Sequence, residues 1–218
     1  MTTASAALPS APTASSSSSS SLSPDEARAF YPDDMTLREA RARYFARSGF
    51  NDATYTERFV HLPAGPFTIV LPNLAARRRA VRIHDLNHIL TGYGTAWDGE
   101  GAISAFELGM GRGPSWMGWM INAGGTALGL LRWPGPTLAA FARGRATSAS
   151  TYRLIHPWDD RVLDERVGTV RAQLGLVDSA PVRTSDIVRA VVAGTIGIAL
   201  HLLPFAIVAA VAAFFIWR

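Results

Sequence analysis

The chain has 218 residues, a formal net charge of +4 and no cysteine. This length allows one domain of ordinary size with appendages. The small, dispersed positive charge argues against nucleic acid as a partner, and the lack of cysteine excludes disulfides and thiolate metal sites.

The segment from Met1 to Ser23 carries no charge and consists almost wholly of alanine, serine, threonine and proline. Such a composition buries too little apolar surface to offset the entropy lost on ordering. We therefore expect residues 1–23 to form a disordered low-complexity tail. This tail has neither the apolar stretch of a secretory signal nor the arginines of an organellar transit peptide.

Helix signals start where this tail ends. The segment Ser23 to Glu26 is a capping box with proline at the first helical position. A second capping box, Thr36 to Glu39, predicts a helix that Gly49 ends. Asn51-Asp52 is a candidate cap for a third, short helix that reaches Phe59.

Longer helices are predicted in the middle of the chain. The run Phe67 to Leu71 has the composition of a strand, but Asn73 is then a candidate cap for a long helix that Gly92 ends. The segment Glu100 to Leu108 also has a helical pattern. Because strand signals are scarce, the sequence predicts a mainly α fold with a single helical, metal-binding domain over residues 24–186.

The clearest chemical signal is a pair of histidines, His84 and His88, on the long helix. Residues four apart project from the same helix face, which lets two imidazoles bind one metal ion. Glu100 follows His88 after eleven residues and offers a carboxylate from the next element. Such nitrogen and oxygen ligands suit Zn²⁺ first, then Fe²⁺ or Mn²⁺.

The role of Asp85 is open at this stage. Its carboxylate can bind the metal, orient a ligand, or form an ion pair with Arg82 three residues back. In zinc proteases a glutamate in this position is the general base, and the shorter aspartate weakens that interpretation.

Several segments share the spacing of a known family signature: His84-Asp85-x-x-His88, Thr91-Gly92, Gly99-Glu100, Phe106-Glu107, and Val170 to Leu176. In these segments the chain resembles the coenzyme Q biosynthesis protein 4 family, from about Ala27 to about Leu176. The resemblance implies a mostly helical domain that binds a metal, usually taken as zinc, through His84, Asp85, His88 and Glu100. It also implies membrane association and a role in ubiquinone biosynthesis. Family members organise the other enzymes and oxidatively remove the ring carboxylate of a prenylated benzoate precursor.

Two features depart from the family pattern. Gly101 stands where the family usually has an apolar residue, which predicts a looser hold on Glu100. The family core also normally lies on a membrane without crossing it, whereas this chain ends in a long apolar segment.

That segment, Ala190 to Trp217, contains 28 residues without a charge. Because about 20 helical residues span a bilayer, we expect residues 187–218 to be a membrane-spanning or membrane-inserted segment. A hairpin broken near Pro204 and a buried core helix are the alternatives. Arg183 and Arg189 on the domain side favour a cytoplasmic domain.

Trp116 and Trp119 begin a glycine-rich apolar stretch suited to an isoprenoid tail, although an ordinary hydrophobic core explains the same pattern. Arg82 belongs to an arginine cluster that either binds a substrate carboxylate or forms a solvated helix face. We expect these three residues to bind substrate.

The favoured hypothesis is a membrane-anchored, metal-dependent oxidative decarboxylase, a lyase, acting on a prenylated hydroxybenzoate. The alternatives are a non-catalytic scaffold that binds prenyl lipid and a metal-dependent hydrolase. The expected cofactor is a divalent metal, Zn²⁺ or Fe²⁺. The expected partners are an isoprenoid or prenylated aromatic lipid, the membrane, other quinone-biosynthesis proteins and, as an option, a second copy of the chain in a homodimer.

Overall fold

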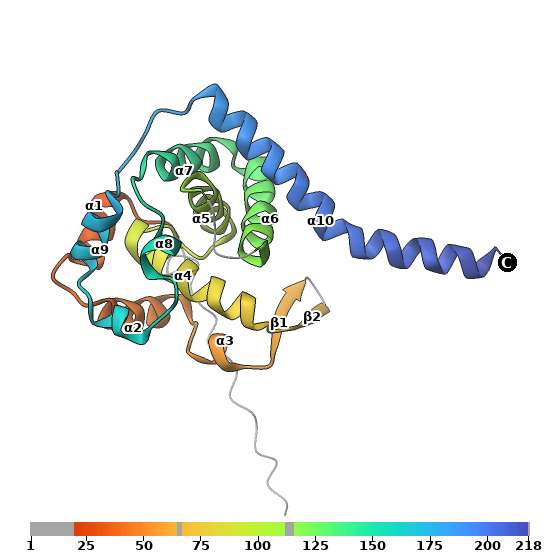
Figure 1. Ribbon diagram of the computed structural model, residues 1–218, viewed down its shortest axis with the longest axis horizontal. Coiled ribbons are helices and arrows are strands. Elements are labelled where there is room, and N and C mark those ends of the chain that lie inside the picture. The colour runs from red at the N-terminus through yellow and green to blue at the C-terminus, as the bar shows by residue number, and fades with distance from the viewer. Residues whose placement is uncertain (1–19, 65–66, 112–115, 218) are drawn as a thin grey trace, which may run out of the picture.

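The computed structural model describes residues 20–64, 67–111 and 116–217. Within these ranges the chain is mainly helical, as the sequence predicts, and one antiparallel hairpin accompanies the helices (Figure 1). The elements in chain order are α1 (Pro24–Phe30), α2 (Leu37–Ser48), α3 (Ala53–Thr56), β1 (Phe59–Ala64), β2 (Phe67–Pro72), α4 (Ala75–Thr91), α5 (Trp97–Gly109), α6 (Trp116–Arg132), α7 (Pro134–Ala146), α8 (Thr151–Ile155), the 3-10 helix η1 (Asp160–Asp164), α9 (Val167–Leu174) and α10 (Thr184–Ile216).

Both predicted capping boxes are confirmed. The hydroxyls of Ser23 and Thr36 accept hydrogen bonds from backbone N–H groups three residues later, and the glutamates there bond back to the cap residues. Gly49 ends α2 in the left-handed conformation, with φ of 76°.

Gly92 ends α4 as predicted, with φ of 84°. A methyl group at this position would lie 2.5 Å from Cβ of Ala27, so the position also needs glycine because α1 packs there. The cap at the other end of α4 differs from the prediction. Leu74, not Asn73, is the N-cap residue, because the side-chain amide of Asn73 donates hydrogen bonds to two carbonyls of the preceding segment.

The β1–β2 hairpin corrects the predicted extent of the third helix. That helix, α3, ends at Thr56, and the chain from Phe59 pairs with β2 in the register Phe59↔Pro72 and Ala64↔Phe67. The composition of Phe67 to Leu71 therefore indicated a strand correctly. Its partner segment has no equally clear local pattern, so only the pairing identifies it as a strand.

The core consists of two apolar clusters beside α4, the helix that carries the two histidines. One contains Leu86 and Ile89 of α4 together with buried residues of α2, η1 and α9. The other contains Ile103 and Phe106 of α5 with Phe141 of α7. Figure 1 shows α5 between α6 and α7, so the helix that carries Glu100 is enclosed by neighbours.

Gly101, where the sequence departs from the family pattern, lies at the closest approach of α5 and α6. A methyl group here would lie 2.8 Å from Cα of Gly129 on α6. Real side chains do not make such a contact with backbone, so a larger residue would push the two helices apart. Gly101 thus allows the close packing that holds α5 in place, contrary to the looser hold expected for Glu100.

We predict that Gly101→Ala lowers the free energy of unfolding by about 1–3 kcal/mol, the usual cost of overpacking. Thermal or denaturant unfolding of the purified variant measures this effect. Gly135→Ala is the matched control, because nothing lies within 4 Å of an added methyl group there. Equal stability of the two variants would contradict the close approach of α5 and α6.

The described chain begins at Ser20, before the predicted end of the tail at Ser23. Leu22 N–H donates to the carbonyl of Gly92 at 2.8 Å, Gly94 N–H donates to Ser21 Oγ at 3.0 Å, and Arg47 donates to the carbonyl of Ser20 at 2.5 Å. These bonds attach residues 20–22 of the predicted tail to the domain. The rest of the predicted tail, residues 1–19, lies outside the described residues.

The C-terminal helix α10 is continuous from Thr184 to Ile216 and contains Pro204. It therefore starts three residues before the predicted segment, and it is not the broken hairpin considered from the sequence. Its first half packs on α6, where Gly194 and Gly197 face Ala127 and Ala123.

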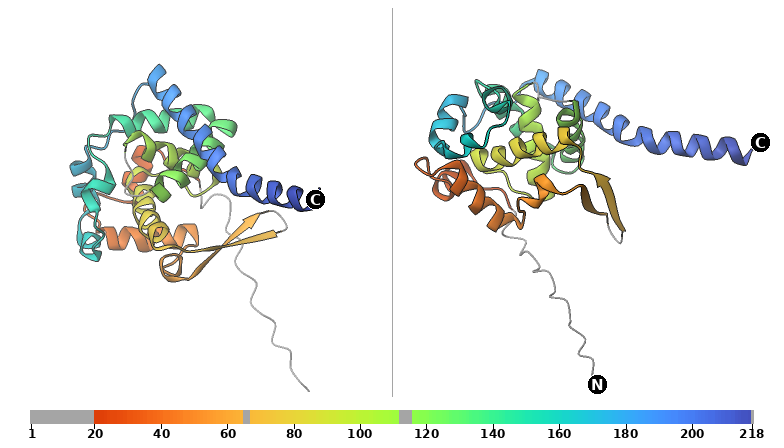
Figure 2. Two further views of the ribbon diagram at one scale, coloured as in Figure 1. Left: turned by 45° about the vertical axis from the view of Figure 1, so that its right-hand side comes forward. Right: turned by 60° about the horizontal axis from the view of Figure 1, so that its bottom comes forward.

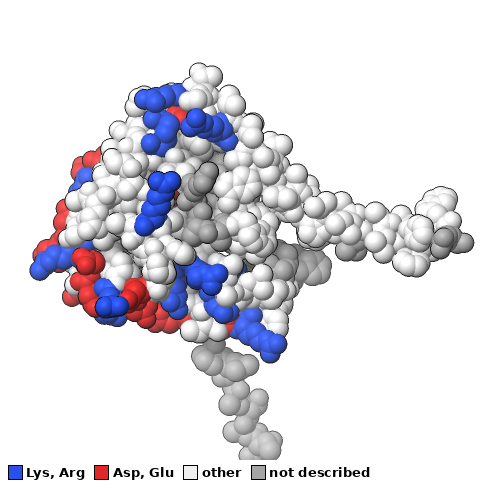
Figure 3. Space-filling model, in the orientation of Figure 1, with Lys and Arg blue, Asp and Glu red and all other residues white. Residues whose placement is uncertain are grey.

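The second half of α10 projects away from the body in every view (Figures 1 and 2). Its large apolar side chains are exposed, with Phe205 at 70% and Phe215 at 73%, so this half is not a core helix. The projecting half carries no charge (Figure 3). By length and composition, α10 can cross a membrane.

Candidate metal centre

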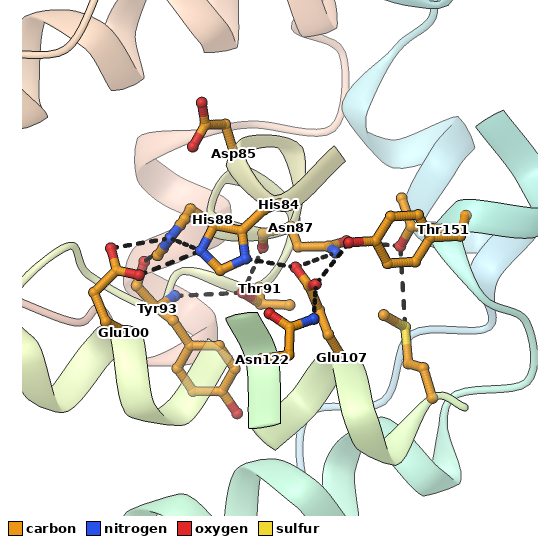
Figure 4. A network of polar contacts seen from close by, with 12 residues as sticks. His84, Asp85, Asn87, His88, Thr91, Tyr93, Glu100, Glu107, Asn122 and Thr151 are labelled. Atoms are coloured by element: carbon orange, nitrogen blue, oxygen red, sulfur yellow. Dashed lines mark hydrogen bonds and ion pairs between the residues drawn. The ribbon is translucent and has the colours of Figure 1, made fainter. Parts of the chain in front are cut away.

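The two predicted histidines and Glu100 meet at one point in the structure. His84 and His88 lie one turn apart on α4, and Glu100 lies in the first turn of α5. Each residue offers one ligand atom, and these atoms lie within 4.8 Å of one another (Figure 4). We call His84, His88 and Glu100 the ligand cluster. These three residues can hold a metal ion.

The distances within the ligand cluster suit a small cation. Nε2 of His84 lies 3.2 Å from Nε2 of His88, and the Glu100 carboxylate lies 3.3 Å from the first and 3.5 Å from the second. Zinc–nitrogen bonds of about 2.0–2.1 Å at tetrahedral angles place two ligand nitrogens about 3.3 Å apart. The side chains therefore need little movement to bind one ion.

The other ring nitrogens face groups that accept hydrogen bonds. Nδ1 of His84 lies 2.9 Å from Oε1 of Glu107, and Nδ1 of His88 lies 2.9 Å from the carbonyl oxygen of Tyr93. A carbonyl or carboxylate oxygen only accepts, so each Nδ1 carries the proton. In the neutral rings, both Nε2 atoms then present lone pairs to each other and to Glu100. Three electron-rich atoms facing one point repel one another unless a cation or a proton lies between them.

The pKa values of the cluster follow from burial and from these contacts. Burial opposes a charge on His84, but Glu107 and Glu100 outweigh it and hold the pKa of His84 well above its ordinary value. Burial lowers the pKa of His88, although Glu100 acts in the opposite direction. Burial acts to raise the pKa of Glu100, but the two histidines hold it below its ordinary value. Without an ion, a proton on His84 therefore balances part of the negative charge.

Among the described residues, histidines, not arginines, are the ion-pair partners of the Glu100 and Glu107 carboxylates. The nearby buried arginines Arg143 and Arg171 bond to backbone carbonyls of Thr91 and Leu90. Because buried anions need a compensating charge, a dication at the cluster would offset these two carboxylates.

Asp85 points away from the ligand cluster (Figure 4). Its carboxylate accepts hydrogen bonds from the hydroxyls of Tyr44, at 3.2 Å, and Tyr55, at 2.5 Å. Burial raises its pKa, against the bond from Tyr55. Of the three roles considered from the sequence, the structure shows neither a place among the ligands nor a pairing with Arg82. Tyr44 also stacks on the ring of His88, so this tyrosine contacts both Asp85 and the ligand cluster.

The three residues expected to bind substrate lie outside the ligand cluster. The guanidinium of Arg82 lies between the rings of Tyr55 and Trp158 and 3.9 Å from Asp160. Trp116 is largely exposed at the start of α6, and Trp119 is half-buried one turn later. These placements leave Trp116 free to contact a lipid, whereas Arg82 is engaged with its neighbours.

Glu107 is the site residue that the sequence did not assign. It lies seven residues after Glu100 on α5, which places both carboxylates on the same helix face two turns apart. The seven-residue spacing could therefore have indicated from the sequence that Glu107 lies near the site. Glu107 has no exposed side-chain surface, whereas the side chain of Glu100 is 32% exposed. The buried acid therefore supports the cluster, and the partly exposed acid lies at its open side.

A small pocket lies on the His88 side of the cluster. Its volume is about 10 Å³, and it is lined by Tyr31, Tyr44, Arg47, Ser48, His88, Gly92, Tyr93, Gly94 and Thr95. This is far below the range of roughly 300–1,000 Å³ typical of pockets that enclose a drug-sized ligand. The pocket is therefore too small to enclose a prenylated molecule.

No protein-family model, no curated protein and no solved structure matches this chain.

Proposed function

We propose that this chain is a membrane-anchored, metal-dependent enzyme of prenyl-lipid metabolism. Its proposed reaction is the oxidative removal of the ring carboxylate from a prenylated hydroxybenzoate, in which molecular oxygen is the oxidant, the carboxylate leaves as carbon dioxide and an oxygen atom takes its place on the ring. The reaction class and the quinone pathway come from the resemblance of the histidine and glutamate segments to the coenzyme Q biosynthesis protein 4 family. The metal dependence comes from the site itself.

The observation that supports the proposal most is the convergence of two histidine Nε2 atoms and one carboxylate on a single point. The two Nε2 atoms lie 3.2 Å apart, each with a proton on Nδ1, and repel one another unless a proton or a cation lies between them. A divalent ion relieves that repulsion and offsets the surrounding carboxylates. The nitrogen and oxygen ligands suit Zn²⁺, with Fe²⁺ as the alternative because molecular oxygen takes part.

A bound divalent ion would supply Lewis acidity toward a carboxylate or phenolate oxygen of the substrate. The chain's own residues hold the ligands in place: Glu107 and the carbonyl of Tyr93 fix the two rings, and Tyr44 covers the face of His88. Glu100, as the most exposed member, marks the side from which a substrate reaches the cluster.

The number of ligands favours an enzyme over a scaffold whose metal only joins helices. Structural zinc sites have four protein ligands, whereas catalytic sites keep one position for water or substrate. With Asp85 bonded to two tyrosines, three ligands remain in the described structure. This arrangement leaves a position open.

The proposed location is a membrane, with α10 as the anchor and the body in the cytoplasm. The apolar projecting half of α10 supports insertion. Arg183 and Arg189 lie at the body end of this helix, and positive residues beside a span favour the cytoplasmic side. A lipid substrate would then reach the body from the bilayer surface.

We predict that Glu100→Ala abolishes quinone production in a cell that lacks its own counterpart, while the helical fold is retained. The loss of one of three ligands disables the site, but the helices are held by apolar packing elsewhere. Quinone content and circular dichroism of the purified variant measure the two effects. Asp98→Ala is the matched control, because it removes an acid from the same turn of α5 but not from the cluster.

The outcomes of this experiment separate the hypotheses. Normal quinone production with Glu100→Ala would support a scaffold and contradict the enzyme. Failure of the unmodified chain to restore quinone would contradict this substrate.

A further inference from the structure

We infer that Glu107 is a positioning residue that fixes His84 so that Nε2, not Nδ1, faces the bound metal. The inference rests on the proposed metal site and adds a residue that neither binds the ion nor touches substrate. Its basis is the hydrogen-bond network around the Glu107 carboxylate (Figure 4).

Both oxygens of Glu107 are fixed by neutral donors. Oε1 accepts from Asn87 at 2.8 Å, and Oε2 accepts from Asn122 at 2.6 Å and from Tyr152 at 3.0 Å. These donors come from α4, α6 and α8, so three different elements hold the carboxylate. Asn87 is itself fixed, because its side-chain oxygen accepts from the Thr151 hydroxyl at 2.6 Å.

The remaining contact of this carboxylate is with His84. Oε1 lies 2.9 Å from Nδ1, and a carboxylate held by three donors accepts the Nδ1 proton without turning. This contact sets both the tautomer and the rotation of the ring. In that orientation Nε2 points at His88 and Glu100, at 3.2 and 3.3 Å.

A purely structural role does not explain this network well. Burying a carboxylate, two amides and a phenol is costly unless every group is bonded, and apolar residues would fill the same space at lower cost. Here the bonds end at one ring nitrogen of a candidate metal ligand. A metal-binding histidine that donates its other ring N–H to a carboxylate is oriented by that bond and becomes a stronger ligand.

The test compares Glu107→Gln with Tyr152→Phe in the full-length protein purified in detergent. Glutamine keeps the size of the side chain but loses the negative charge. Tyr152→Phe removes one donor to Oε2 and leaves the contact between Oε1 and His84. Zinc affinity is measured by competition with a chelator, and ligand geometry by the visible absorption of the Co²⁺-loaded protein.

We expect Glu107→Gln to weaken zinc binding by roughly tenfold to a hundredfold, the usual effect of losing such a partner, and to change the Co²⁺ spectrum. We expect Tyr152→Phe to lower thermal stability while affinity and spectrum stay near those of the unmodified protein. Unchanged affinity and spectrum in folded Glu107→Gln would overturn the inference and leave Glu107 a structural residue. If the unmodified chain binds no metal, the proposed function itself fails.

A second measurement does not depend on the folding of any variant. In the zinc-loaded unmodified protein, nitrogen–proton correlation spectra of the histidine rings should show a protonated Nδ1 on His84 that exchanges slowly with water. A His84 ring with its proton on Nε2 would overturn the inference.

Discussion

Replacing either His84 or His88 by alanine is expected to remove the bound divalent ion from the purified protein. The unmodified chain, prepared without chelator, should contain about one zinc or iron ion per molecule. Each variant should contain almost none, because the two Nε2 atoms lie 3.2 Å apart and share one ion. Elemental analysis measures this content and also identifies the metal. Finding no metal in the unmodified protein, or a metal content in both variants unchanged from that of the unmodified protein, would contradict the site.

The sharpest control for this experiment is Asp85→Asn. Asp85 lies beside His84 in the sequence, but its carboxylate bonds to Tyr44 and Tyr55 and not to the cluster. Asparagine keeps an oxygen that accepts from a tyrosine hydroxyl. We therefore expect this variant to keep its metal, whereas a ligating Asp85 would make it lose the metal.

The metal content is best measured above neutral pH. The pKa of His84 is raised, so an ion must displace the proton that this histidine retains at lower pH.

The sequence predicted most of the ligand cluster because its signal is local. His84 and His88 share a helix face by spacing alone, and the caps at Thr36, Gly49 and Gly92 fixed helix ends that the structure confirms. Such patterns depend on neighbours within one or two turns, which any reader of the sequence can inspect.

The orientation of Asp85 could not be predicted in the same way. On the helix it lies about 100° from His84, which is compatible with either side of α4. The two hydroxyls that attract its carboxylate belong to Tyr44 and Tyr55, which are 41 and 30 residues away in the sequence. Only the fold brings them there, and the outcome decides whether the cluster has three or four ligands.

The contact of Glu107 with His84 could not be predicted from the sequence for a related reason. Glu107 has a readable spacing from Glu100, but its other partners, Asn122 and Tyr152, come from α6 and α8. Asn122 lies in an apolar stretch of the sequence, and its role becomes clear only when its hydrogen-bond partner Glu107 is known. The hairpin was missed likewise, since β1 is a strand only through pairing with β2.

The C-terminal helix gives the second large expected effect. Removing residues 202–218 should release the protein from membranes that have been washed with carbonate, and the body should still unfold cooperatively. The projecting half of α10 is apolar and exposed, whereas Ala190 of the first half is fully buried. Removing residues 190–218 should release the protein too. It should also destabilise the body, because it uncovers the buried residues Ala123 and Ala127 of α6.

The length of the projecting half indicates how much of α10 must enter the bilayer. From Leu202 to Ile216, where α10 ends, the helix rises about 22 Å at 1.5 Å per residue, which is short of the roughly 30 Å of a bilayer core. The turns just before Leu202 must therefore enter the bilayer as well, and their outer residues Ile196 and Leu200 are exposed and apolar.

Because α6 runs antiparallel beside these turns, with Ala127 at Gly194 and Ala123 at Gly197, its first turn lies on the membrane side. Trp116, 69% exposed in that turn, should then contact lipid. The difference in fluorescence between the unmodified protein and the Trp116→Phe variant reports on Trp116. In vesicles this fluorescence should be protected from an aqueous quencher. If Trp116 is quenched equally in vesicles and after removal of residues 202–218, this placement is contradicted.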